Sequence, residues 1–186
     1  MQIAEAQRDL SRAYAGGGPG VIISGLIWAA AWLAETRAGI AAGFTVLFFG
    51  GMLIYPAALL VNRVFLKRAR EQAGNPGGPL VMESTIAMIA GLFAAWLFLK
   101  YDPALVMPLS AIMVGTHYFA FRTAYGDKLF WLLAALVTAA GFAGIYNFAP
   151  LPGGVTLTVA IIEAAFGAFL TWRHLRGSGG RETAGR

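Results

Sequence analysis

The segment Gly115-Thr-His117-Tyr-Phe-Ala-Phe-Arg122-Thr-Ala-Tyr125-Gly126-Asp127-Lys128 decides how the rest of the chain is divided. It begins with mostly apolar residues, and its charges start at Arg122. In a helix that crosses a lipid bilayer, charged residues mark the point where the hydrocarbon core meets water. We therefore expect one apolar helix to end near residue 121, a short basic turn to follow, and the next helix to begin near residue 129.

The composition indicates that lipid is the solvent of these helices. Of the 186 residues, 58% are hydrophobic and 12% are charged, whereas soluble domains have roughly 45–50% apolar and about 25% charged residues. Cysteine is absent, which excludes disulfides, cysteine–zinc sites and thiol nucleophiles. The net charge is +5, but the basic residues cluster at the ends of apolar segments, so we expect the lipid bilayer and not nucleic acid as the partner.

The apolar segments predict an all-α integral membrane bundle of six transmembrane helices. The run from Leu129 to Ile162 has no charge and is longer than the roughly 20 residues that one span needs, so the break between Asn147 and Gly154 should divide it. Pro56 should kink the second helix, because it removes a bond to the carbonyl of Met52. We predict helices at about residues 19–34, 38–62, 80–99, 103–121, 129–147 and 154–173, in one domain of residues 19–174.

Shorter segments flank this domain. Residues 1–18 are predicted to form a short cytoplasmic or interfacial segment, either a helix lying on the membrane or a frayed tail. Residues 175–186 are polar and rich in glycine, and we predict a disordered tail.

Positive charge is distributed unequally between the two ends of the predicted helices. With six crossings, the side of the N-terminus collects twelve of the fourteen Lys and Arg residues, and the other side has Arg37 and Lys100. Short loops that are rich in Lys and Arg stay in the cytoplasm. We therefore predict that both termini are cytoplasmic.

Glu163 is the first candidate functional residue, because an ionisable group inside a membrane helix is costly to bury. It precedes Arg173 by ten residues, which places it about 15 Å from the cytoplasmic boundary and near the middle of the bilayer. Its helical face also carries Ala160 and Gly167, so a neighbouring helix should pack closely there. Glu163 could bind a proton or a cation, or it could be a protonated acid that hydrogen-bonds a neighbouring helix.

Three further residues complete the candidate polar site. His117 could relay protons or sense pH, or it could be a neutral histidine with a hydrogen bond to another helix. Glu83 and Arg122 lie at the cytoplasmic ends of consecutive helices, where we predict an ion pair; anchoring in the headgroups is the alternative. His117 and Glu163 alone supply too few ligands for a metal, and we expect no cofactor.

Several motifs follow one another along the chain: Ala13-Tyr-Ala-Gly-Gly-Gly-Pro-Gly20, Ser24-Gly-Leu26, Phe49-Gly-Gly-Met-Leu-Ile-Tyr-Pro56, Glu83-Ser-Thr85 and Phe121-Arg-Thr-Ala-Tyr-Gly126. In this order the chain resembles a bacterial membrane-protein family, domain of unknown function 7010, from its N-terminal segment through the fifth helix. The resemblance implies a small multi-pass protein, which we expect in the bacterial inner membrane. It implies no activity, ligand or catalytic residue.

For function, the sequence leaves three classes open. It has no phosphate-binding glycine loop, HExxH or GxSxG motif, which favours a non-catalytic protein that senses, scaffolds or assembles with copies of itself or another membrane protein. The alternative is a transporter or channel for a small solute or ion, supported by Glu163, His117 and the broken second helix. An intramembrane enzyme acting on lipid is the third class, and enzymatic activity is not expected.

Overall fold

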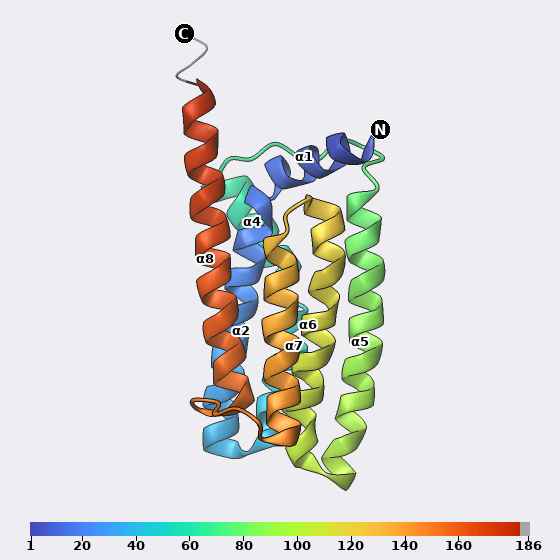
Figure 1. The fold of residues 1–186 in the computed structure, drawn as a ribbon, viewed down its shortest axis with the longest axis vertical. Helices are drawn as coiled ribbons and strands as arrows, with labels where there is room; N and C mark the ends of the chain where they lie inside the picture. The colour runs from blue at the N-terminus through green and yellow to red at the C-terminus, as the bar shows by residue number, and fades with distance from the viewer. Residues whose placement is uncertain (183–186) are drawn as a thin grey trace.

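The computed structural model describes residues 1–182 of the chain, with side chains through residue 176. Figure 1 shows long helices packed side by side along one axis, with helix α1 (Ile3–Ala13) lying across one end of the bundle. No strand occurs within the described range. The all-α prediction is therefore confirmed.

The helices that follow the long axis agree with the predicted segments. Five of them are long and apolar enough to cross a membrane, and the bent pair of α3 and α4 adds a sixth if it is counted as one broken span. Three short turns, η1 (Ala15–Gly17), η2 (Val61–Phe65) and η3 (Pro103–Leu105), extend or join them. The long helices and the bent pair are α2 (Gly18–Ala38), α3 (Ile40–Gly51), α4 (Ile54–Leu60), α5 (Gly77–Tyr101), α6 (Val106–Tyr125), α7 (Leu129–Tyr146) and α8 (Gly154–Glu182).

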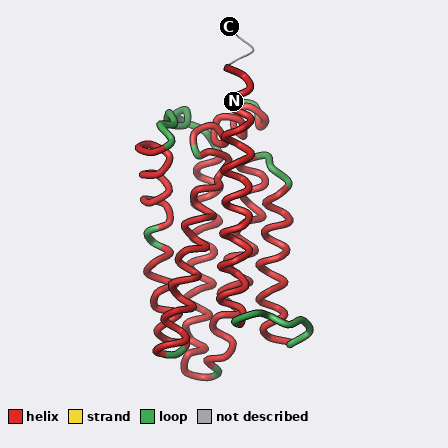
Figure 2. The backbone as a smooth tube through the Cα atoms, turned by 90° about the vertical axis from the view of Figure 1, so that its left-hand side faces the viewer, coloured by secondary structure: helices red, strands yellow, loops and turns green. Residues whose placement is uncertain are grey.

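The break between α3 and α4 follows from the proline predicted to kink this span. The span is bent by 46° at the break between the two helices. Figure 2 shows the break as a short non-helical segment part-way along one helical span. Pro56 lies in the first turn of α4, where its missing N–H leaves the carbonyl of Met52 without its helical partner. The kink is therefore at the predicted place.

The connections alternate between the two ends of the bundle. Helix α1, the long connection of residues 66–76 and the turn between α6 and α7 lie at one end, and the turns after α2, α5 and α7 lie at the other (Figure 1). Arg37 and Lys100, in the last turns of α2 and α5, are thus at the end opposite α1. Which end faces the cytoplasm stays a prediction.

Helix α1 packs on the end of the bundle through its apolar side. Ala6, Leu10 and Ala13 are buried, and α1 contacts α5, α6 and η1. Of the two interpretations of the N-terminal segment, the structure has the helix and not the frayed tail.

Two helix pairs form the centre of the bundle, and small residues bring each pair close. The most extensive contacts are those of α2 with α8 and of α6 with α7. A Cβ atom at Gly25 would lie 2.7 Å from the backbone nitrogen of Ala164, and one at Gly115 would lie 2.6 Å from that of Thr138. Only a residue without a side chain allows backbones to approach so closely.

The C-terminal boundary differs from the predicted one. We predicted a disordered tail over residues 175–186 after the transmembrane domain of residues 19–174, but α8 continues to Glu182. The remainder of the predicted tail, residues 183–186, lies outside the described residues.

Candidate functional site

The Glu163 carboxyl group lies inside the bundle and is fully buried. The hydroxyl group of Tyr118, on α6, donates a hydrogen bond of 3.0 Å to its Oε1 atom. Ser24, on α2, is buried beside both side chains. The Oε2 atom is also buried, and it has no partner in hydrogen-bonding geometry among the described residues. Three helices thus bring one carboxyl and two hydroxyl groups together.

The surroundings of Glu163 limit what this site can bind. Among residues 1–176, no lysine or arginine forms an ion pair with it. A buried carboxylate without a counter-charge is costly, so the site suits reversible binding of a proton or a small cation. The described residues contain no group of three or more His, Asp or Glu side chains that could hold a metal ion.

A cavity of about 600 Å³ lies beside the loop of residues 147–154, at the end of the bundle opposite α1. We call it the distal vestibule. It is lined by α2, α3, η3, α6, α7, α8 and the loop before α8, with Glu35, Met107, Pro108, Gly144, Leu151 and Thr156 among its walls. Thr156 and Glu163 are on the same helix, two turns apart, which corresponds to about 10–11 Å along the axis. The vestibule therefore approaches Glu163 from this end.

Apolar side chains separate the vestibule from the buried carboxyl. Trp28 lies between Glu35 and Ser24 on α2, Val114 between Met107 and Tyr118 on α6, and Val159 between Thr156 and Glu163 on α8; all three apolar residues belong to the buried core. The vestibule and the buried carboxyl are thus separate in this structure.

An aromatic cluster closes the opposite approach to Glu163. It consists of Tyr118, Phe121, Tyr125 and Phe130, with ring centroids 5.4 Å apart for Tyr118–Phe121, Phe121–Phe130 and Tyr125–Phe130. A Cβ atom at Gly17 would lie 3.0 Å from the Phe130 ring, so η1 packs directly on this cluster. Glu163 is therefore enclosed on both sides.

His117 lies next to Tyr118 in the sequence but bonds to a different helix. Its Nδ1 atom is 2.8 Å from the Oγ atom of Ser84 on α5, and its ring packs edge-on against Phe121 at 4.7 Å. It thus links α5 to α6, while Tyr118 contacts Glu163. A proton-relay role for His117 stays a prediction.

The predicted ion pair between Glu83 and Arg122 is wrong in this structure. Glu83 is exposed on α5, and the Arg122 guanidinium lies 4.9 Å from the ring centroid of Trp131 on α7. Arg122 is in the last turn of α6, where the aromatic face of α7 offers a cation–π contact. The side chain therefore turns toward α7 and away from α5.

A family model matches residues 3–173 of the chain and describes a family of unknown function, DUF7010. The chain belongs to DUF7010. The predicted resemblance is confirmed, and the matched region extends from α1 into α8, so it includes Glu163, Glu35 and Tyr118. No curated protein and no solved structure matches the chain. DUF7010 membership and the apolar helices are compatible with a multi-pass membrane protein.

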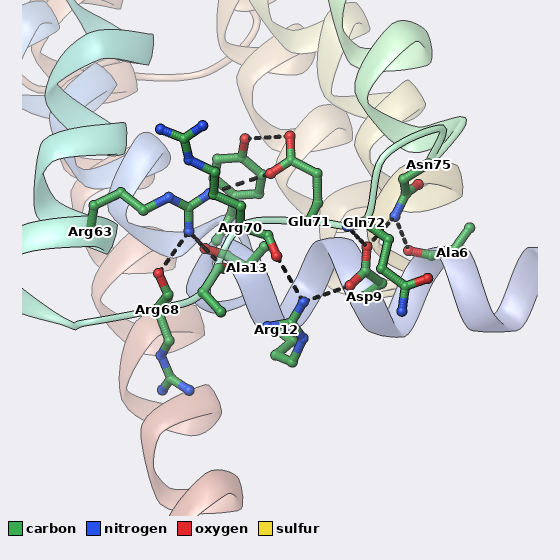
Figure 3. Close-up of polar contacts among 12 residues, drawn as sticks. Ala6, Asp9, Arg12, Ala13, Arg63, Arg68, Arg70, Glu71, Gln72 and Asn75 are labelled. Atoms are coloured by element: carbon green, nitrogen blue, oxygen red, sulfur yellow. Dashed lines mark hydrogen bonds and ion pairs between the residues drawn. The ribbon is translucent and has the colours of Figure 1, made fainter.

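Sequence reasoning missed a second polar site of this DUF7010 chain, which fastens α1 to the bundle (Figure 3). The Asp9 carboxylate accepts hydrogen bonds from Arg12 at 2.7 Å, from the backbone of Gln72 at 2.8 Å and from Asn75 at 2.9 Å. Burial alone would raise the pKa of Asp9, but these hydrogen bonds and the Arg12 charge outweigh burial and hold it below its usual 3.8. Asp9 therefore ties α1 to the connection of residues 66–76.

Arg63 fastens the same region from η2. Its guanidinium donates hydrogen bonds to the carbonyl oxygens of Ala13, Arg68 and Ala69 at 3.0, 3.0 and 2.8 Å, and it pairs with Glu71 at 3.3 Å. A planar guanidinium can serve several carbonyls at once. From the sequence, Arg63 and residues 66–76 are recognisable as a polar connection. Their role in fastening α1 is visible only in the structure.

Proposed function

We propose that this protein transports a small cation, or a solute coupled to protons, and that the Glu163 carboxyl is the binding group. The observation that carries the proposal is the complete burial of this carboxyl in a bundle of apolar helices, without an ion pair to any side chain of residues 1–176. Ionisable groups placed so in membrane proteins mark ion and proton pathways.

Two features of the bundle support transport. The distal vestibule ends two helical turns from Glu163, and the aromatic cluster closes the other side, as an occluded state of a carrier requires. The broken span of α3 and α4 resembles in kind the interrupted helices of many transporters.

Carbodiimide labelling tests this proposal. Membranes containing the full chain are treated with dicyclohexylcarbodiimide across a range of pH, with Glu163→Gln as the blank and Glu83→Gln as a matched control. We expect labelling of Glu163 that changes with pH and is reduced by a transported cation, and the same labelling in Glu83→Gln. A folded protein that shows no labelling of Glu163 at any pH would overturn the proposal.

A second candidate, assembly with another membrane protein or a second copy, is favoured by one observation. Of the 18-residue apolar stretch of α5, 11% is buried inside the protein, compared with 39–50% of the corresponding stretches of the other uninterrupted spans. Its exposed face carries Ala87, Ala90 and Ala94, and small residues allow close helix association. Cross-linking of single cysteines along α5 tests it, with cysteines on exposed positions of α7 as the control.

We also propose that the protein resides in the bacterial inner membrane with both termini in the cytoplasm. The support is the charge asymmetry, with Arg37 and Lys100 as the basic residues of the opposite side. A fluorescent protein fused to the C-terminus should fluoresce, and alkaline phosphatase fused there should be inactive. The opposite pair of results would reverse the orientation.

A further inference from the structure

The distal vestibule has the dimensions and lining of a site for an organic ligand. Its volume of about 600 Å³ falls in the usual range of roughly 300–1,000 Å³ for small-molecule pockets, which are mostly apolar with a few polar groups. Its walls include the apolar side chains of Ile40, Met107, Pro108, Leu151 and Val155. Such walls bind hydrocarbon or aromatic groups.

The cavity surface combines polar and apolar atoms, and Glu35 gives it a negative charge. It is the one residue with a charged side chain among those that line the vestibule within the described chain. The Thr156 hydroxyl donates a hydrogen bond of 2.5 Å to its Oε2 atom, while Oε1 has no hydrogen-bond partner among the described side chains. Gly43 of α3 packs against the stem of Glu35, since a Cβ atom there would lie 2.7 Å from the Glu35 Cβ. The carboxylate is thus held in place with one oxygen available.

We propose that the distal vestibule binds a lipophilic organic cation, such as a quaternary ammonium or phosphonium, with Glu35 as its counter-charge. A single carboxylate does not suit Mg²⁺ or Ca²⁺, which need several oxygen ligands or retained waters. An organic cation needs one negative group and apolar surface, and both are present here. Phe148 at the rim adds an aromatic face that can attract a cation.

This inference names the substrate class of the proposed transport function. It rests on that function for the claim that the bound cation is transported. Glu35 with Thr156, and Ser24 with Glu163, are two polar levels on the same helices, α2 and α8. A cation bound at the vestibule level would be two turns from the buried carboxyl. Binding itself can be measured without transport.

Equilibrium binding of tritiated tetraphenylphosphonium to the purified full chain in nanodiscs tests the inference. Tetraphenylborate, an anion of the same shape, serves as the charge control. We expect saturable binding that Glu35→Gln weakens about tenfold or more, as the loss of one ion pair in a partly enclosed site would. Thr156→Val keeps the charge and should weaken binding only about two- to threefold, and Glu83→Gln, outside the vestibule, should leave it unchanged.

Two results would overturn the inference: absence of saturable binding to the unaltered protein, or binding that is equal in Glu35→Gln. Equal saturable binding of tetraphenylborate would also overturn it, since the site would then recognise shape and not charge. The Glu163 labelling experiment keeps the two proposals apart. Binding at Glu35 without reactivity of Glu163 would refute transport alone, and reactivity of Glu163 without binding would refute the vestibule site alone.

Discussion

The tight contact between α2 and α8 should be broken by a single methyl group. In Gly25→Ala the new Cβ atom would lie 2.7 Å from the nitrogen of Ala164 and 3.0 Å from the carbonyl oxygen of Ala160. Ordinary contacts of a Cβ atom begin near 3.4 Å, so the two backbones must separate by about 0.7 Å. Overpacking of this kind costs about 1–3 kcal/mol, and the better helix propensity of alanine returns about 0.5–1 kcal/mol. The difference between these ranges is about 0–2.5 kcal/mol, so we expect a net loss of about 1 kcal/mol.

Gly51→Ala is the matched control, because a Cβ atom at Gly51 meets nothing within 4 Å. Thermal unfolding in detergent can be followed by tryptophan fluorescence, with Trp28 buried on α2 as a nearby reporter. At about 2–4 °C per kcal/mol for a chain of this size, a loss of about 1 kcal/mol in Gly25→Ala should lower the unfolding temperature by about 2–4 °C. Gly51→Ala should leave it unchanged or raise it slightly. If Gly25→Ala is as stable as Gly51→Ala, the backbone contact does not exist as described.

Two further predictions concern the fastening of α1. The pKa of Asp9 lies below 3.8 in the folded protein, so its stabilisation of α1 is present above that value and is lost as pH falls through the folded-state pKa. Hydrogen exchange of residues 3–13 should accelerate at that pH, and Asp9→Asn should accelerate it at neutral pH. Glu5→Gln, which preserves the capping box, should leave the exchange unchanged. Arg63→Lys should cost about 1–3 kcal/mol, because an ammonium group has one nitrogen and cannot bond the carbonyls and pair with Glu71 from separate nitrogens while its flat face covers the Tyr14 ring. Trypsin should then cleave residues 66–76 faster. Equal cleavage in Arg63→Lys and in the exposed control Lys67→Arg would contradict this reasoning.

The helices were predictable because local signals decide them. Long uncharged runs, charges at their ends and breakers such as Pro56 act within a few residues of one another. The docking of α1 was not predictable in the same way. It depends on Asp9 meeting Gln72 and Asn75, residues more than sixty positions away, and no periodicity in the sequence reports such a pairing.

In the candidate site, too, one residue was predictable from local sequence and its partners were not. Glu163 was identifiable because a charge in an apolar run is conspicuous, and the small residues on its face indicated a close neighbour. Its partners Tyr118 and Ser24 resemble ordinary membrane-helix residues and become recognisable only when α2 and α6 are placed. Arg122 shows the converse: its position at a helix end was predictable, but its choice of Trp131 over Glu83 depends on which neighbouring helix offers a favourable surface.

The packing also limits how a carrier built on this fold could move. The α2–α8 and α6–α7 pairs have backbones in direct contact at Gly25 and Gly115, so sliding within either pair would create steric clashes. The hydrogen bond from Tyr118 to Glu163 joins one pair to the other. A cation that binds both carboxyl oxygens of Glu163 would compete with Tyr118 for Oε1, whereas a proton can bind Oε2, which has no partner within the described chain, and leave this hydrogen bond in place. Transport through this bundle would therefore require the two pairs to move as rigid units, and a cation bound at Glu163 would weaken one of the contacts between them, beside the packing of α8 on α6 and α7.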